Sequence, residues 1–233
     1  LNGALPEVGF IQKSGHYIVQ GNCDETFGMA SLFWLEALYK QYENVMANSP
    51  ESIENEKKFT VVLFKNKESI IDYTKIDYNN SIQRWWPITK EVLASIDTPL
   101  WKEKLVSNAF EQLLFTENIL PVNIEEGLRA YFSNISIENE IIVFKGHSEK
   151  NELYNIEKWL ELNENTFYSN EYQENIKQSH AWVHFLIHYK HGKYLPLLRN
   201  CITLLRKGSS WESVKQTIFT HERIESINSD FKQ

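Results

Sequence analysis

Hydrophobic positions divide the chain into short apolar runs near the N-terminus and longer stretches of helical periodicity further on. The runs at 15–22 and 58–66 are rich in β-branched and aromatic residues and end on turn-forming residues, so each predicts a strand. Between them, 23–47 predicts a long amphipathic helix, and 67–76 predicts a short one. The core face expected for the long helix comprises Met29, Leu32, Phe33, Leu35, Leu38, Tyr39 and Tyr42.

After Pro99 the periodicity predicts helices almost throughout. The predicted segments are Trp101–Thr116, Glu125–Asn134, Leu153–Leu162, Asn175–His191, Leu195–Leu205 and Trp211–Thr220. The stretch 78–95, with Trp85 and Trp86 before a proline, predicts an ordered aromatic loop or an edge strand. The stretch 138–152 predicts an exposed connection with room for a short strand.

This order of elements predicts an α+β fold. A small N-terminal layer of strands and helices over 1–98 precedes a mainly helical part over 99–233. No Pro/Gly-rich linker separates the two parts, so we expect a single domain over 1–233.

Composition narrows the class of protein. Hydrophobic residues make up 42% of the chain and aromatic residues 13%, which is typical of a globular domain. The net charge of -7 and the absence of a long basic run argue against a nucleic-acid partner. No apolar run approaches the roughly 20 residues that cross a bilayer. Cys23 and Cys201 are too few for a disulfide scaffold, which leaves either one bridge or two buried thiols.

The stretch 105–134 has the layout of a zinc peptidase, a helix followed by a second helix that opens on Glu125 and Glu126. On the first helix Asn108 and Gln112 lie one turn apart, away from the apolar arc. Zincins carry His-Glu-x-x-His on such a helix, where the two histidines bind zinc and the glutamate polarises the metal-bound water. The expected core arc comprises Val106, Ala109, Phe110, Leu113 and Leu114.

Several blocks resemble one known family. They are "TVVLF" at 60–64, "LPVNIEEGLRAYF" at 120–132, "IKQSHAWVHFL" at 176–186 and the closing helices over 195–219. Together they resemble the gluzincin-type peptidase-like family labelled DUF1570, within the peptidase MA superfamily. The resemblance covers nearly the whole chain and implies a zincin-like fold. It also implies a zinc site completed by a glutamate that matches Glu126.

The chain departs from this family at the catalytic motif. Alignment on Glu126 places Asn108 and Gln112 at the two zinc-binding histidines, and Ala109 at the water-activating glutamate. The family's "LP-x-W" tryptophan is also missing, since Asn123 or Ile124 occupies that region. Amides bind zinc poorly, so we expect no catalytic residue and no resident zinc.

A histidine stripe at 180–191 gives a second, different hypothesis. His180, His184, His188 and His191 fall on one arc of a predicted helix. Histidines four residues apart can chelate a transition metal, and a glutamate such as Glu126 would complete the site. The alternative interpretation is a polar helix face that happens to use histidine.

The leading hypothesis is a catalytically inactive, gluzincin-like domain that binds a peptide, a glycan or a partner protein. The expected surfaces are Trp85 and Trp86, with Glu125 and Glu126 in the cleft beside the Asn108 helix. The rival is a metal-dependent hydrolase that uses the histidine stripe, and a third reading is a structural domain in a larger assembly. A start without methionine and the family resemblance together predict export to the periplasm, the cell surface or the medium.

Overall fold

A computed structural model describes residues 9–46, 58–75, 84–86, 90–115, 119–146 and 154–232, with the backbone alone at 84–86. The chain divides into two compact units, which are described separately. Unit 1 comprises Leu1–Tyr42, Ser49–Thr116 and Ile135–Val143. Unit 2 comprises Glu43–Asn48, Glu117–Asn134 and Phe144–Gln233.

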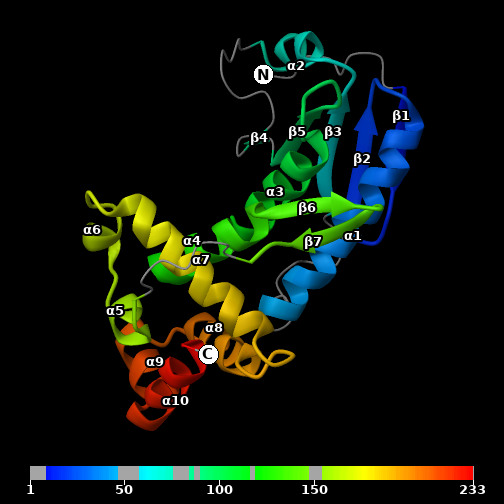
Figure 1. Cartoon of the computed structure of the whole chain (residues 1–233). Helices are drawn as coiled ribbons and strands as arrows, with labels where there is room; N and C mark the ends of the chain where they lie inside the picture. Colours follow the sequence, from blue (N-terminus) through cyan, green and yellow to red (C-terminus); the bar gives the residue numbers. More distant parts are fainter. Residues whose placement is uncertain are drawn as a thin grey trace. The chain divides into compact units, whose positions relative to one another are not determined.

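Unit 1 is built on a five-stranded sheet in the order β1-β2-β3-β5-β4 (Figure 1). Its strands are β1 (Phe10–Lys13), β2 (Tyr17–Gly21), β3 (Phe59–Phe64), β4 (Arg84–Trp86) and β5 (Glu91–Ser95). The three central strands β2, β3 and β5 are parallel, while β1 and β4 pair antiparallel at the two edges. The sheet is therefore mixed, with an antiparallel strand at each edge.

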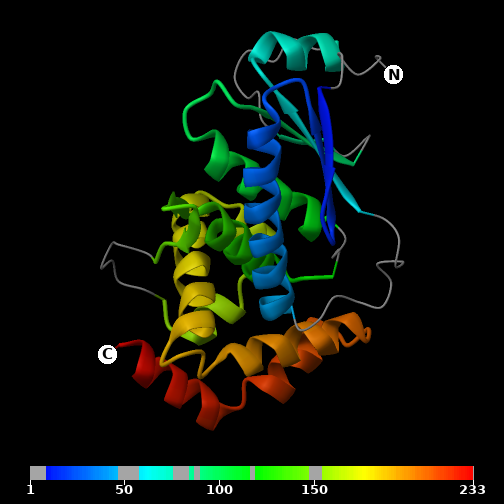
Figure 2. The same cartoon turned by 90° about the vertical axis from the view of Figure 1, so that its right-hand side faces the viewer.

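The central strands carry apolar side chains on both faces, and helices cover both faces so that these side chains are buried. The helices of unit 1 are α1 (Glu25–Met46, up to Tyr42), α2 (Lys67–Thr74) and α3 (Trp101–Leu114). On one face Val62, Phe64 and Leu93 pack with Ile70 of α2. The other face meets α1, which runs alongside the sheet in Figure 2, and Tyr17 makes an edge contact with Tyr39 at 6.4 Å.

Two further strands, β6 (Ile135–Glu138) and β7 (Ile141–Phe144), form a separate two-stranded sheet. Among the helices, α1 and α3 contact each other through aromatic rings. Trp34 lies 5.7 Å from Trp101 and Tyr42 lies 6.4 Å from Phe110, measured between ring centroids.

Unit 2 is helical over its main part. Its helices are α4 (Val122–Ser133), α5 (Ile156–Leu160), α6 (Glu164–Phe167), α7 (Tyr172–His188), α8 (Leu195–Arg206), α9 (Trp211–Ile218) and α10 (His221–Phe231). Helices α4 and α7 pack closely at Gly127, where a Cβ would lie 2.6 Å from Val183 Cγ2 and 2.7 Å from the carbonyl oxygen of Ser179. Trp182 of α7 stacks on Phe231 of α10 at 3.8 Å and so ties the C-terminal helix to the core.

The α+β class, with a small sheet and a mainly helical C-terminal half, is confirmed. Most predicted helices are present within a few residues of their expected ends, and 78–95 contains the edge strand β4. Five features were not predicted: β1, the central strand β5, a full β6–β7 hairpin, α6 and α10. No helix in the described part of the chain is long and apolar enough to cross a membrane.

Some details of the prediction are wrong. Met29 and Phe33 were expected in the core, but each is 61% exposed, because the buried face of α1 instead carries Trp34. The helix expected to reach His191 ends at His188, and His191 adopts a left-handed backbone with φ of 59°. The internal division expected at 98/99 stays a prediction; within unit 1, α3 packs on β5 and β4.

Candidate functional site

The first candidate is the face of α3 that the family resemblance matches to the zinc-binding motif. Gln112 was expected to lie away from the apolar arc, but its side chain is buried at 2% exposure. Its Nε2 donates hydrogen bonds to the carbonyl oxygens of Thr60 at 3.3 Å and Lys90 at 2.8 Å. Gln112 therefore joins α3 to the start of β3 and to the residue before β5.

The neighbouring motif positions do not present catalytic chemistry either. Ala109 is fully buried, together with the rest of the apolar arc, which confirms that face as core. Asn108 is half-buried. The side-chain amide of Gln112, which donates to two backbone carbonyls, holds α3 against the sheet, and its nitrogen has no lone pair with which to bind a metal ion.

The second candidate is the pair of glutamates on α4, in unit 2. Arg129 lies one turn further along, with Nη2 2.8 Å from Glu125 Oε1 and Nε 3.5 Å from Glu126 Oε1. Tyr168 Oη donates to Glu126 Oε1 at 3.1 Å. Burial raises the pKa of both carboxyl groups, the charges of Glu126 and Glu164 add to the rise at Glu125, and the hydrogen bond from Tyr168 partly opposes it at Glu126.

Asn123 stands in the region of the family's missing tryptophan. It is fully buried and donates from Nδ2 to the carbonyl oxygen of Trp159 at 3.0 Å. The start of α4 is thus fixed to α5 by a polar contact. The two glutamates project from a well-anchored helix, and each is paired with a side chain of its own unit.

The third candidate is the histidine stripe on α7. His180 is buried, His184 is half-buried and His188 is partly exposed, so the stripe is not a uniformly solvated polar face. Adjacent ring centroids lie 6.2 Å apart for His180 and His184, and 4.6 Å apart for His184 and His188. Tyr131 Oη of α4 lies 2.8 Å from His188 Nε2.

Burial changes the ionisation of these rings. It lowers the pKa of His184 to about 4, with further lowering by the neighbouring His188 and His180. It also lowers the pKa of His188. Both imidazoles are therefore neutral at pH 7. Among the described residues, no group of three or more His, Cys, Asp or Glu side chains is arranged to hold a metal ion.

The remaining predicted residues are placed as follows. Trp85 and Trp86 lie on the edge strand β4, and their side chains fall outside the described part of the structure. Cys23 and Cys201 are free thiols, the first half-buried and the second buried. Burial raises the pKa of Cys23 to about 11 and that of Cys201 to about 12, which makes both poor nucleophiles.

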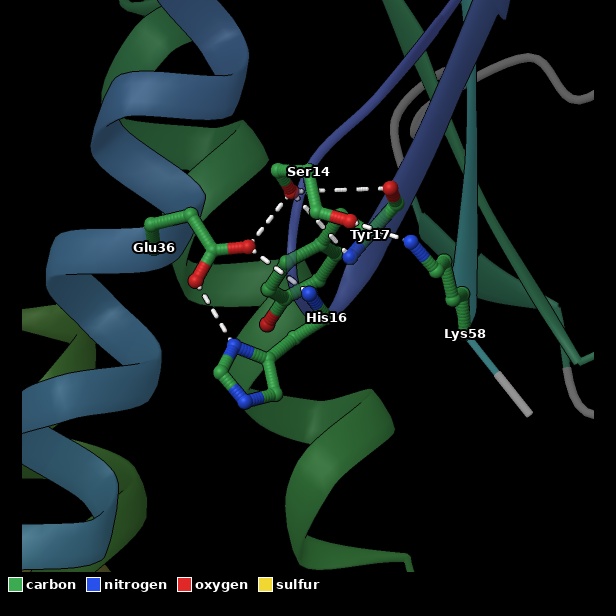
Figure 3. Close-up of polar contacts among 5 residues, drawn as sticks. All are labelled: Ser14, His16, Tyr17, Glu36 and Lys58. Atoms are coloured by element: carbon green, nitrogen blue, oxygen red, sulfur yellow. Dashed lines mark hydrogen bonds and ion pairs between the residues drawn. The ribbon is translucent and has the colours of Figure 1, made fainter. Parts of the chain in front are cut away.

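A polar cluster that the sequence did not predict lies in unit 1, around Glu36 of α1 (Figure 3). Glu36 Oε1 accepts hydrogen bonds from Ser14 Oγ at 2.5 Å and from the backbone N–H of His16 at 2.8 Å. Glu36 Oε2 lies 2.7 Å from His16 Nδ1. The carboxylate sits between the serine and the histidine, as Figure 3 shows, so His16 cannot act as a base on Ser14.

This cluster fixes the β1–β2 turn to α1. The His16 ring also stacks on Tyr39 at 3.7 Å, and Lys58 donates to the carbonyl oxygen of Ser14. Burial acts to raise the pKa of Glu36, but the hydrogen bonds from Ser14 and His16 and the charge of His16 outweigh it, so the pKa lies below its usual value. No sequence signal links Glu36 to a turn 20 residues earlier, since only the fold brings them together.

Comparison with known proteins adds no assignment. No protein-family model matches this sequence, and no curated protein matches it. The gluzincin-type resemblance consequently rests on its motifs and remains a prediction.

Proposed function

We propose that the chain is a catalytically inactive, zincin-like domain of the gluzincin type that binds an extended peptide segment of a partner protein. The observation that carries the proposal is the role of Gln112. At a position matched to a zinc-binding histidine, this side chain is buried and holds two sheet carbonyls. A residue committed to the packing of α3 is not available to a metal ion or a substrate.

The arrangement of unit 1 supports the binding part of the proposal. Among the residues that the structure describes, strand β4 is the last strand of the sheet and pairs with β5 on one side only. An open strand edge presents unpaired backbone N–H and C=O groups, which an extended peptide can pair with by strand addition. Trp85 and Trp86 lie on this strand, and aromatic residues are enriched where proteins bind one another.

The rival hydrolase is less well supported. It would need Glu126 and the histidines to be free to coordinate a metal ion in unit 2. Glu126 is engaged by Arg129 and Tyr168. Each of these contacts would have to break before a His/Glu site formed.

Peptide binding can be tested by selecting peptides from a display library and measuring their affinity by fluorescence anisotropy. Neighbouring residues on a strand direct their N–H groups to opposite sides. Of Arg84 and Trp85, one residue therefore directs its N–H outward and the other directs its N–H toward β5. Proline at the first removes a donor from the open edge, and proline at the second removes a donor to β5. We expect the variant that folds normally to lose peptide binding, because edge strands tolerate proline on their open side.

The same pair of substitutions on β1, at Ile11 and Gln12, is the matched control for the opposite edge of the sheet. Peptide binding that survives in the folded β4 variant but not in the β1 variant would move the site to β1. Selection of glycans or of folded proteins only, with no peptide bound, would contradict strand addition. The proposal includes export of the chain to the periplasm, the cell surface or the medium, which fractionation of the source cells tests.

A further inference from the structure

One feature of α7 is not used by the proposed function. His184 and His188 are one helical turn apart, with ring centroids 4.6 Å apart and an interplanar angle of 41°. Metal–nitrogen bonds to histidine are about 2.0–2.1 Å long, so two imidazoles at this separation can reach one ion after small rotations. His180 lies one turn earlier but its ring is further from His184, at 6.2 Å.

We propose that His184 and His188 form a two-histidine site for a divalent transition-metal ion such as zinc, with water in the remaining positions. Imidazole is a preferred ligand of zinc, copper and nickel, whereas magnesium and calcium prefer oxygen. The site is independent of the proposed peptide-binding function. It holds an ion without peptidase chemistry.

The surroundings of the two rings favour coordination. Tyr131 Oη is 2.8 Å from His188 Nε2, and a ring that donates its Nε2–H to this hydroxyl has the lone pair of Nδ1 available for a metal ion. Holding the second ring nitrogen in this way is how proteins orient metal-binding histidines. Among the described residues, nothing forms a hydrogen bond to the ring of His184.

Gly146 packs against the edge of the His184 ring. A Cβ on Gly146 would lie 3.2 Å from His184 Cε1 and 3.3 Å from Nε2, closer than most real Cβ contacts. Any side chain at this position would press on the ring edge that carries the nitrogen. A bound ion would link His184 to His188, and His188 in turn contacts Tyr131 of α4.

Isothermal titration with zinc chloride tests the site directly. The full chain is purified without a histidine tag, treated with chelator and titrated at pH 7.5. We expect one zinc ion per chain, with binding lost in both His184→Ala and His188→Ala. Tyr131→Phe removes the orienting hydroxyl and should weaken binding by about 10–100-fold.

His221→Ala is the matched control, because His221 is exposed on α10 and pairs only with Glu225 among the described residues. Its titration should match the wild type. His184→Gln keeps the size of the side chain and serves if His184→Ala unfolds. Electron paramagnetic resonance of the copper-loaded chain adds an independent readout, with two nitrogen ligands in the wild type and one in either His184 variant.

Two results would overturn the proposal. One is the absence of saturable binding by zinc or copper in the folded wild type. The other is binding that persists in both histidine variants. Zinc that is lost in Glu126→Gln but retained in His184→Ala would instead indicate a site of the family type, and would count against the proposed function as well.

Discussion

Replacement of Gln112 by leucine is expected to destabilise the chain while leaving its shape nearly unchanged. The substitution removes two hydrogen bonds and leaves the carbonyl oxygens of Thr60 and Lys90 facing an apolar side chain. At a net value of about 1 kcal/mol for each bond, the expected loss is about 2 kcal/mol. For a chain of this length that corresponds to roughly 4–8 °C in Tm.

Replacement of Gln112 by glutamate should lower the free energy of unfolding at pH 7 more than replacement by leucine does. A carboxylate cannot donate to the two carbonyls, and its buried charge faces their oxygen atoms, so we expect a loss of at least about 4 kcal/mol. The defect should shrink as the pH falls, because a protonated carboxyl group regains one donor. Urea denaturation followed by circular dichroism at pH 7 and pH 5 measures both effects.

Gln216→Leu is the control, because Gln216 is exposed on a helix and the same chemical change there should stay within about 0.5 kcal/mol of the wild type. If Gln112→Leu unfolds at the same urea concentration as the wild type, the hydrogen bonds of Gln112 do not stabilise the packing of α3 on the sheet. Gln112 would then be available for another role, and the proposal of an inactive domain would be contradicted.

Two further perturbations test other parts of the structure. Glu36→Gln removes an ion pair that is partly exposed, so the expected loss at pH 7 is only about 0.5–1 kcal/mol. Folding lowers the pKa of Glu36, so this stabilisation is fully present above the unfolded pKa of about 4.3 and is lost as the pH falls through the folded pKa. A difference in unfolding free energy between Glu36→Gln and the wild type that is equal at pH 7 and pH 3 would contradict the ion pair. Gly127→Ala places a methyl group 2.6 Å from Val183 Cγ2, so we expect a lower Tm by calorimetry although alanine is about 1 kcal/mol better than glycine in a helix. A higher Tm would show that α4 and α7 are less tightly packed than described.

Periodicity alone predicted much of the fold because long amphipathic helices carry a strong signal. The apolar arc of α3 is the clearest case, since every residue placed on it is buried. The strand β5 was not predicted because its run of five residues is short and lies close after the aromatic pair Trp85 and Trp86, which dominates the local pattern. Met29 and Phe33 were misplaced because a helix with apolar residues on two sides does not reveal which side is buried.

The candidate sites were harder to predict, for a physical reason. Gln112 is a polar residue on a helix, and only the positions of two carbonyl groups from distant strands make its burial favourable. His16 and Glu36 meet through the packing of a hairpin on α1, which no local pattern encodes. The histidine stripe was visible in the sequence, but its contact with Tyr131 depends on the crossing of α4 and α7.

Zinc content and peptide hydrolysis, measured together on tag-free protein, test the central claim most directly. Three proteins are compared: the wild type, Glu126→Gln and the double variant of His184 and His188 to alanine. We expect any bound zinc to be lost in the double variant and retained in Glu126→Gln, with no zinc-dependent hydrolysis in any of the three proteins. Stoichiometric zinc that disappears in Glu126→Gln together with a zinc-dependent peptidase activity would contradict it.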